Sequence, residues 1–174
     1  ILSLLMDRKI TLRPPTPEDG VRVHQLVAQC PPLDPNSIYC NLLQCTHFSG
    51  TSVAADIEGE LVGFISGYRP PQQTSTLFIW QVAVGEKARG QGLASRMLVN
   101  ILARDECKEV DHLETTITED NQASWALFQG LADKLQTTLT QSPQFDRELH
   151  FAGQHDTEVL VRIGPFKQPV TTEA

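Results

Sequence analysis

The sequence has no long hydrophobic run and no excess of positive charge, and each absence narrows the classes of function it can have. No stretch approaches the roughly 20 apolar residues that a membrane-spanning helix needs, and no secretory signal is recognisable. Fourteen Lys and Arg against 21 Asp and Glu give a formal net charge of −7 at pH 7. A protein that binds nucleic acid presents a basic face to the phosphates. We therefore expect neither a nucleic acid nor a membrane as the partner, whereas a small cationic substrate is compatible with the acidity.

Cysteine is scarce, and the cysteines form no pattern typical of a metal site or a nucleophile. None belongs to a C-x-x-C pair, and none has histidines at zinc-ligand spacing, so we expect no metal. No Ser-His-Asp or Cys-His-Asn signature surrounds Cys40, Cys45 or Cys107, so we expect no acyl-enzyme. The pattern favours reduced, structural cysteines in a cytoplasmic protein.

The hydrophobic pattern predicts a mixed α/β fold. A chain of 174 residues fits one domain, which we place at residues 1–174 with a core of about 10–166. The predicted strands are 10–13, 52–57, 61–68, 76–84, 110–118, 147–151 and 158–163. The predicted helices are one that begins at Thr16 and stops before Pro31, then 36–45, 93–107 and 121–135. This order predicts a mixed central sheet of about seven strands flanked by about four helices.

A glycine-rich segment, residues 85–95 (the cradle), lies between the strand that ends at Val84 and the next helix. Gly90, Gly92 and the small Ala94 let consecutive backbone N–H groups turn toward one point. That point is a helix N-terminus, where unpaired donors and the helix dipole favour an anion. Arg89 adds a positive charge, and the cradle therefore predicts a pyrophosphate site.

Three other interpretations compete for the cradle. A nucleotide P-loop requires GxxxxGK[ST], but position 91 is Gln and no Lys–Ser/Thr pair follows Gly92. A dinucleotide fingerprint requires GxGxxG directly after the strand, but Ser95 stands where the third glycine belongs. The remaining alternative is a strand-to-helix turn that binds nothing.

Two motifs resemble those of the GNAT superfamily of N-acetyltransferases. Residues 89–94, read as Arg-x-x-Gly-x-Ala, resemble its acetyl-CoA motif. Asn121, Ser124 and Phe128 resemble its second motif, in which the asparagine faces the pantetheine arm; Asn121 is equally a candidate helix N-cap. The superfamily usually has tyrosine where this chain has Phe128, so a general acid for the leaving thiolate is missing there.

The resemblance implies the acyl-CoA N-acyltransferase fold, in which two neighbouring strands splay apart beside the cradle and acetyl-CoA is the co-substrate. Backbone N–H groups on the open strand would bind the pantetheine arm and polarise the thioester. An amine attacks directly and must first lose a proton, because an alkyl ammonium has a pKa of roughly 10. The implied acetyl-CoA-binding residues are Val82, Ala83, Val84, Arg89, Gly90, Gln91, Gly92, Leu93, Ala94, Asn121, Ser124 and Phe128.

Longer segments closely resemble the L-2,4-diaminobutyric acid acetyltransferases of ectoine biosynthesis. They are PPLDPNSIY (31–39), LLQCTHF (42–48), LFIWQVAV (77–84), LETTIT (113–118) and HFAGQHDTE (150–158). The similarity extends over about residues 10–166. It implies transfer of acetyl to the 4-amino group of L-2,4-diaminobutyrate, giving N4-acetyl-L-2,4-diaminobutyrate. A cytoplasmic homodimer with a role in osmoprotection is also implied.

Five residues of these segments are candidates for binding the diamine, and each has a structural alternative. Asp34 binds an ammonium or forms a turn. Tyr39 and Trp80 line the acceptor site or pack in the core. His155 and Glu158 contact and deprotonate the amine, or lie in a solvated turn. We take Glu158, Tyr39 and His155 as the candidate catalytic residues, and the sequence does not decide which of them is the base.

Two other functions share the acetyl-CoA motifs and stay open on the sequence alone. One is an N-acetyltransferase for a different small amine, such as a polyamine or an antibiotic. The other is an acyl-CoA-binding sensor domain without turnover.

Overall fold

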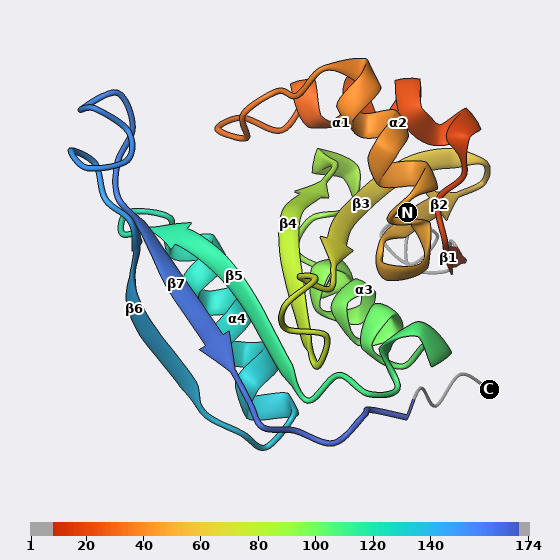
Figure 1. Ribbon diagram of the computed structural model, residues 1–174. Coiled ribbons are helices and arrows are strands. Elements are labelled where there is room, and N and C mark those ends of the chain that lie inside the picture. Colours follow the sequence, from red (N-terminus) through yellow and green to blue (C-terminus); the bar gives the residue numbers. More distant parts are fainter. Residues whose placement is uncertain (1–8, 171–174) are drawn as a thin grey trace.

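The computed structural model describes residues 9–170, which form one seven-stranded sheet with helices on both faces (Figure 1). The strands are β1 (Ile10–Arg13), β2 (Val53–Ile57), β3 (Glu60–Tyr68), β4 (Thr76–Val84), β5 (His112–Thr118), β6 (Leu139–Phe145) and β7 (Glu158–Ile163). The α-helices are α1 (Gly20–Ala28), α2 (Ile38–Thr46), α3 (Leu93–Leu102) and α4 (Gln122–Lys134). The predicted mixed sheet of seven strands with four helices is confirmed.

The strand order, β1-β2-β3-β4-β5-β7-β6, contains one parallel pair, β4 and β5. The register joins only residues 76–78 of β4 to residues 112–114 of β5. Beyond them the two strands diverge, and Figure 1 shows the halves of the sheet splaying apart toward the C-terminal ends of β4 and β5. At the point of divergence the Thr115 hydroxyl donates a hydrogen bond to the Ile79 carbonyl at 2.9 Å. The sheet is therefore continuous at one end and open at the other.

Each face of the sheet has its own hydrophobic core. On the face covered by α3 and α4, apolar residues recur at helical spacing along α3 and are at most 2% exposed. They are Leu93, Met97, Leu98, Ile101 and Leu102. The smaller core on the other face joins α1 to β2, β3 and β4 through Val23, Leu26, Val27, Ala54, Phe64 and Ala83. The hydrophobic pattern of the chain thus fixes which helix covers which face.

Two short-range signals determine where elements begin and turn. The Ser37 hydroxyl accepts a hydrogen bond from the Cys40 N–H at 3.1 Å and caps α2. Glu58 and Gly59 have φ values of 51° and 82°, as a two-residue hairpin turn between β2 and β3 requires. These two signals set the start of α2 and the register of the hairpin.

One predicted strand is wrong, and one predicted helix is too long. The strand expected at 147–151 lies instead at Leu139–Phe145, where polar residues and Pro143 obscure it. β6 is an edge strand, and an edge tolerates proline because one side of its backbone needs no partner. Asp146 then closes a turn, since its carboxylate accepts from the N–H groups of Glu148 and Leu149 at 2.9 Å each. The helix expected at 93–107 ends at Leu102, and a separate 3-10 turn, Asp105–Cys107, follows it.

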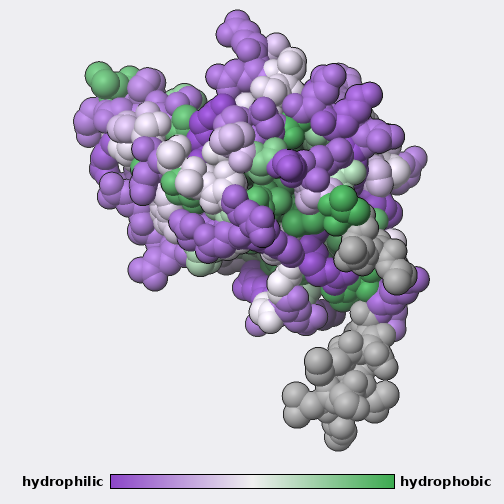
Figure 2. Space-filling model, turned by 90° about the horizontal axis from the view of Figure 1, so that it is seen from below, coloured by the Kyte–Doolittle hydropathy of each residue, from purple (hydrophilic) through white to green (hydrophobic). Residues whose placement is uncertain are grey.

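The surface is mainly hydrophilic. Figure 2 shows hydrophilic side chains over most of one face, with hydrophobic ones in separate patches between them. Among residues 9–170, no helix is long and apolar enough to cross a membrane. The large apolar side chains that are exposed include Tyr39, Trp80, Phe145 and Leu149, and the first two of them belong to the site described next.

Candidate active site

The open edge of β4 presents backbone groups to the space between the two halves of the sheet. The Gly85 N–H donates to the Val62 carbonyl of β3 at 2.7 Å, and bonded and non-bonded positions alternate along an antiparallel pair. The N–H and C=O groups of Val82 and Val84 therefore point away from β3, toward the open side. Those of Ala83 point toward β3, and its side chain is buried in the α1 core. Of the three residues expected to bind the pantetheine arm, Ala83 thus offers no backbone group to this edge.

A β-bulge at Trp80 determines which residues face the open edge. Consecutive β3 residues pair with Gln81 and Ile79, so the register passes over Trp80. Such a bulge bends the strand and re-aims the residues that follow it. It comes two residues after Phe78, the last β4 residue that is paired with β5. The bend therefore lies where the two strands begin to separate.

The cradle has the backbone geometry of an anion site. Gly90 and Gly92 have φ values of 75° and 70°, which glycine adopts without strain. The backbone N–H groups of residues 90–95 have no acceptor within the part of the chain that the structure describes. A Cβ atom on either glycine would meet nothing within 4 Å, so the space beside them is open. Consecutive free donors at the start of α3 favour an anion in that space.

A pocket of about 190 Å³ opens at the cradle. Its lining is Val84, Ala88, Arg89, Gly90, Gly92, Leu93, Ala94, Ser95 and Leu127. The exposed Arg89 donates from Nε to the Val84 carbonyl at 3.0 Å, which holds the guanidinium at the pocket. Gln91 is exposed, and its Nε2 lies 3.5 Å from the Lys87 carbonyl. A fixed cation and free N–H donors thus occupy one short segment, as a pyrophosphate site requires.

The start of α4 lies beside the open end of β5. Asn121 caps the helix, because its side-chain oxygen accepts from the Ser124 N–H at 3.2 Å. Trp125 Nε1 donates to the Thr118 carbonyl at 3.1 Å and ties the first turn of α4 to β5. Phe128 is 2% exposed and belongs to the core, and the preceding residue, Leu127, lines the pocket. The N-cap interpretation of Asn121 is confirmed, and no hydroxyl lies at position 128.

Three of the predicted diamine-binding residues meet, although they come from distant parts of the chain. We call Asp34, His155 and Glu158 the acceptor cluster. Nε2 of His155 lies 3.9 Å from Oδ2 of Asp34 and 3.8 Å from Oε1 of Glu158. Figure 1 shows the α1–α2 connection and the β6–β7 loop approaching each other at the open end of the sheet. The Glu158 side chain is only 21% exposed, so a solvated turn is the wrong description of this residue.

The backbone orients the imidazole of His155 so that its Nε2 faces the two carboxylates. Its Nδ1 lies 2.6 Å from the Asp156 carbonyl, which can only accept, so Nδ1 carries the proton. Nε2 therefore accepts when the ring is neutral and donates to the carboxylates when the ring is protonated. The Phe151 ring, with its centroid 4.6 Å away, packs against the imidazole and holds its orientation. The two carboxylates on either side of Nε2 suit a substrate that carries ammonium groups.

The pKa of Glu158 is raised, chiefly because burial disfavours its charged form. His155 and a hydrogen bond from Thr116 lower this pKa, whereas the charge of Asp34 raises it. A carboxylate with a raised pKa is a stronger base, which suits proton abstraction. Thr116 was missed by sequence reasoning, because only the alignment of β5 beside β7 brings it to Glu158.

Tyr39 and Trp80 are exposed aromatic residues. Tyr39, in the first turn of α2, is 70% exposed, and Trp80 at the bulge is 43% exposed. Trp80 packs edge-to-face against Tyr68 with the ring centroids 6.2 Å apart. The alternative that these residues pack in the core is therefore wrong, and both aromatic rings are free to contact a small molecule.

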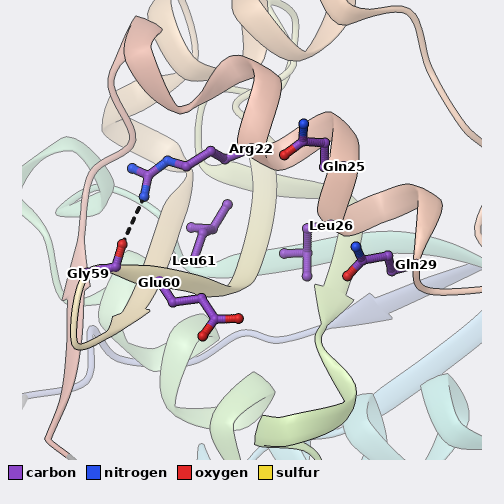
Figure 3. Close-up of a pocket in the computed structure, with 7 residues that line it drawn as sticks. All are labelled: Arg22, Gln25, Leu26, Gln29, Gly59, Glu60 and Leu61. Carbon is purple, nitrogen blue, oxygen red and sulfur yellow. Dashed lines mark hydrogen bonds between the residues drawn. The ribbon is translucent and has the colours of Figure 1, made fainter.

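A larger pocket, of about 340 Å³, lies away from these features between α1 and the β2–β3 hairpin (Figure 3). It contains no residue of the cradle or of the acceptor cluster. Its arginine, Arg22, already donates hydrogen bonds to the Asp19 carboxylate and to the Gly59 carbonyl. The cradle and the acceptor cluster are therefore the better candidate site.

Within residues 9–170, no group of three or more His, Cys, Asp or Glu is arranged to hold a metal ion.

The splayed strands and the cradle define a GNAT N-acetyltransferase, and comparison with known proteins agrees. Residues 21–132 match the profile of the family described as the acetyltransferase (GNAT) family. The structure of the ribosomal-protein-S18-alanine N-acetyltransferase from Escherichia coli has a TM-score of 0.66 and covers 95% of this chain and 99% of that one. At 14% identity, this likeness shows the shared fold alone.

Proteins with higher sequence identity to this chain identify its family within the GNAT acetyltransferases. L-2,4-diaminobutyric acid acetyltransferase of Methylotuvimicrobium alcaliphilum is 64% identical over 158 residues, 91% of this chain and 92% of the relative. The enzyme of that name from Halomonas elongata is 53% identical over 157 residues, 90% of this chain and 81% of the relative. A solved structure shows diaminobutyrate acetyltransferase EctA from Paenibacillus lautus in complex with its substrate L-2,4-diaminobutyric acid and coenzyme A. It superposes on this chain with a TM-score of 0.87 and 38% sequence identity, covering 94% of this chain and 99% of that one. The chain therefore belongs to the GNAT acetyltransferases and, within them, to the family of L-2,4-diaminobutyric acid acetyltransferases.

Proposed function

We propose that this protein transfers the acetyl group of acetyl-CoA to the 4-amino group of L-2,4-diaminobutyrate. The product is N4-acetyl-L-2,4-diaminobutyrate, a step in ectoine biosynthesis. The observation that carries the proposal is the acceptor cluster, which bridges the two splayed strands. Asp34 is tied to β4 by a hydrogen bond from Gln81, and Glu158 pairs with Thr118 at the end of β5. The names of the relatives and the ligands of the P. lautus complex support the same reaction.

We assign acetyl-CoA to the β4 edge and the cradle. The outward N–H groups of Val82 and Val84 suit the pantetheine arm and the thioester carbonyl, where negative charge develops during attack. Arg89 and the free N–H groups of residues 90–95 suit the pyrophosphate, because the space beside Gly90 and Gly92 is open. The other residues assigned to acetyl-CoA are Gln91, Leu93, Ala94, Asn121, Ser124 and Phe128.

We assign the diamine to the acceptor cluster, with Tyr39 and Trp80 as aromatic walls. The substrate carries two ammonium groups and one carboxylate, and the cluster supplies a carboxylate for each ammonium: Asp34 for the α-ammonium and Glu158 for the reacting amine. The half-buried Glu158 takes the proton of the reacting amine, directly or through His155. The C–N bond forms as the C–S bond breaks. The thiolate of coenzyme A takes a proton from water, since a thiol has a pKa of about 8.5 and Phe128 has none to give.

We also propose a cytoplasmic homodimer in which residues 1–174 form a single domain, with a core of about 10–166, that serves osmoprotection. The use of acetyl-CoA and the four free cysteines support the compartment. Phe145 and Leu149, 41% and 85% exposed, support a protein contact on the β6–β7 hairpin. Sedimentation velocity tests the assembly, and a monomer over the whole micromolar range would contradict it.

A thiol-release assay over a panel of amines tests the function. Diaminobutyrate should release coenzyme A far faster than polyamines or aminoglycosides. Preference for another amine would establish an N-acetyltransferase of different specificity. Binding of acetyl-CoA without release for any amine would establish the sensor domain.

A further inference from the structure

Gln81 is a buried polar residue to which the reaction as described assigns no part. It is 8% exposed, and it lies on β4 next to the bulge, on the face covered by α1 and α2. Its Oε1 is buried and has no hydrogen-bond partner among the described residues. A buried acceptor left unpaired destabilises the folded state. Because Gln81 destabilises the fold in this way, we expect it to have a role that offsets the loss.

That role is visible at the other end of the amide. Nε2 of Gln81 donates to the backbone carbonyl of Asp34 at 3.3 Å. A carbonyl can only accept, so the amide nitrogen must be the atom that faces it. The hydrogen bond joins residues that are 47 positions apart in the chain.

The Asp34 segment has little else to hold it. The helix α1 ends at Ala28, and α2 begins with Ser37 as its N-cap. Among the hydrogen bonds of the described residues, the one from Gln81 is the bond that fastens residues 34–36 to the sheet. The Asp34 carboxylate itself is 87% exposed, and within residues 9–170 its one ion pair is with Nε2 of His155, at 3.9 Å. The position of this carboxylate therefore depends on its backbone, and its backbone depends on Gln81.

The same strand also presents the donor edge. Val82, the residue after Gln81, turns its backbone toward the open side of β4, where we place the thioester. Gln81 turns its side chain toward the Asp34 segment. One dipeptide thus relates the position of the diamine to the position of the acetyl group. A fixed relation of this kind is what oriented attack requires.

We infer that Gln81 is a positioning residue that sets the chain-length specificity for the diamine by holding the Asp34 carboxylate at a fixed distance from the β4 edge. This inference rests on the proposed function. A loosened segment would let Asp34 follow a longer substrate, so discrimination would fall together with affinity. An ordinary side-chain hydrogen bond corresponds to roughly a tenfold change in an equilibrium.

The test compares Gln81→Met, Gln81→Glu and the control Ser66→Ala. Met keeps the length and burial of the side chain and removes both polar atoms, whereas Glu keeps an acceptor and lacks the donating amide. Ser66 pairs with Gln81 from β3, is fully buried, and has a hydroxyl without a partner. Its hydroxyl makes no hydrogen bond to Asp34, so Ser66→Ala controls for the loss of a buried polar group on the same face.

We expect Gln81→Met and Gln81→Glu to raise KM for diaminobutyrate by about tenfold and to leave KM for acetyl-CoA within about twofold. The ratio of kcat/KM for diaminobutyrate to that for ornithine should fall in both variants. Ser66→Ala should match the wild type. Gln81→Met should melt no lower than the wild type, because it removes an unpaired buried acceptor. A fall in kcat with both KM values unchanged, or wild-type kinetics in Gln81→Met, would overturn the inference.

Amide hydrogen exchange tests the inference without any substrate. The hydrogen-bonded amides that flank the segment are those of Leu33, which donates to the Cys30 carbonyl, and Cys40, which donates to the Ser37 hydroxyl. Both should exchange faster in Gln81→Met than in the wild type, and amides of α3 should not change. Equal exchange at Leu33 and Cys40 would overturn the inference even if the enzyme is active. A wild-type enzyme that does not acetylate diaminobutyrate refutes the proposed function instead, and faster exchange in Gln81→Met would then still establish that Gln81 holds the segment.

Discussion

Nε2 of His155 faces Oε1 of Glu158 at 3.8 Å, while Nδ1 of the same ring donates to the Asp156 carbonyl. The backbone carbonyl thus orients the ring so that Nε2 is the nitrogen that faces the carboxylate. Nε2 donates to Glu158 when the ring is protonated and can accept a proton when the ring is neutral. If the amine binds here as proposed, this pair offers two groups that can receive the proton that the amine must lose before it attacks.

Glu158→Gln should lower kcat for diaminobutyrate and remove the acid limb of the pH–rate profile. Burial raises the pKa of Glu158, so the wild-type carboxylate is lost to protonation at a higher pH than an ordinary glutamate. General base catalysis contributes roughly 10²- to 10⁴-fold. Steady-state kinetics from pH 5 to 9 measure the effect. If KM for diaminobutyrate rises while kcat and its profile persist, Glu158 anchors an ammonium and is not the base.

The same substitution should not destabilise the protein above neutral pH. The pKa of Glu158 is raised by folding, so the carboxyl favours the folded state below its ordinary pKa. That stability is lost as the pH rises through the raised pKa, and glutamine has no charge to desolvate. Thermal melts should show Glu158→Gln at or above the wild type at pH 8, with the difference shifting against the variant toward pH 4. A variant that is least stable relative to the wild type at pH 8 would contradict this assignment.

Much of the fold is predictable because its signals are local. The spacing along α3, the cap at Ser37 and the turn at Gly59 each act within a few residues. β6 is missed, since an edge strand exposed along most of its length carries no alternating apolar pattern. The cradle is predictable for the same local reason. The bulge at Trp80 is not, because register arises from the pairing of whole strands.

The acceptor site is only partly predictable. Asp34, His155 and Glu158 were indicated by resemblance to a family, and nothing in their spacing along the chain says that they meet. Their proximity depends on the divergence of β4 from β5 and on the course of two long connections. Thr116 and Gln81 were missed because each acts through a cross-strand or segment contact that has no sequence signature.

Ala94→Glu should abolish the binding of acetyl-CoA and leave the fold intact. Ala94 lines the cradle pocket in the first turn of α3, so a carboxylate there repels a pyrophosphate and fills its space. It is a cleaner test than Gly92→Val, because the φ of 70° at Gly92 would strain valine. Titration calorimetry measures the affinity. The control is Gly130→Ala, an exposed site on α4 with open space around a Cβ atom, which should bind acetyl-CoA normally. Unchanged affinity in folded Ala94→Glu would refute the pyrophosphate assignment.

Acetylation should occur only at the 4-amino group, and lysine should be a poor substrate. If Asp34 holds the α-ammonium and Glu158 holds the reacting amine, the distance between the two nitrogens is fixed, and each added methylene misplaces the nucleophile. Two-dimensional NMR of the product identifies the acetylated nitrogen. A spectrum dominated by the 2-acetyl isomer would reverse the assignment of the two carboxylates.

Asp34→Asn and Glu158→Gln should weaken the binding of diaminobutyrate to different extents. A charge-assisted hydrogen bond is worth about 1.5–3 kcal/mol, or roughly ten- to a hundredfold in binding. Asp34 is 87% exposed and Glu158 is 21% exposed, so solvent screens the first far more than the second. We expect about a tenfold rise in KM for diaminobutyrate in Asp34→Asn and a larger loss of kcat/KM in Glu158→Gln.

Salt separates the two residues further. The rise in KM caused by Asp34→Asn should become smaller as the ionic strength rises, because screening acts on exposed charges. The loss of kcat/KM caused by Glu158→Gln should persist. KM for acetyl-CoA should stay nearly constant in both variants, since the cradle lies on other elements. The double variant should lose less than the sum of the two single losses, because both carboxylates act on one bound diamine. If both single variants leave the diaminobutyrate kinetics untouched, the amine binds elsewhere and the acceptor cluster is only structural.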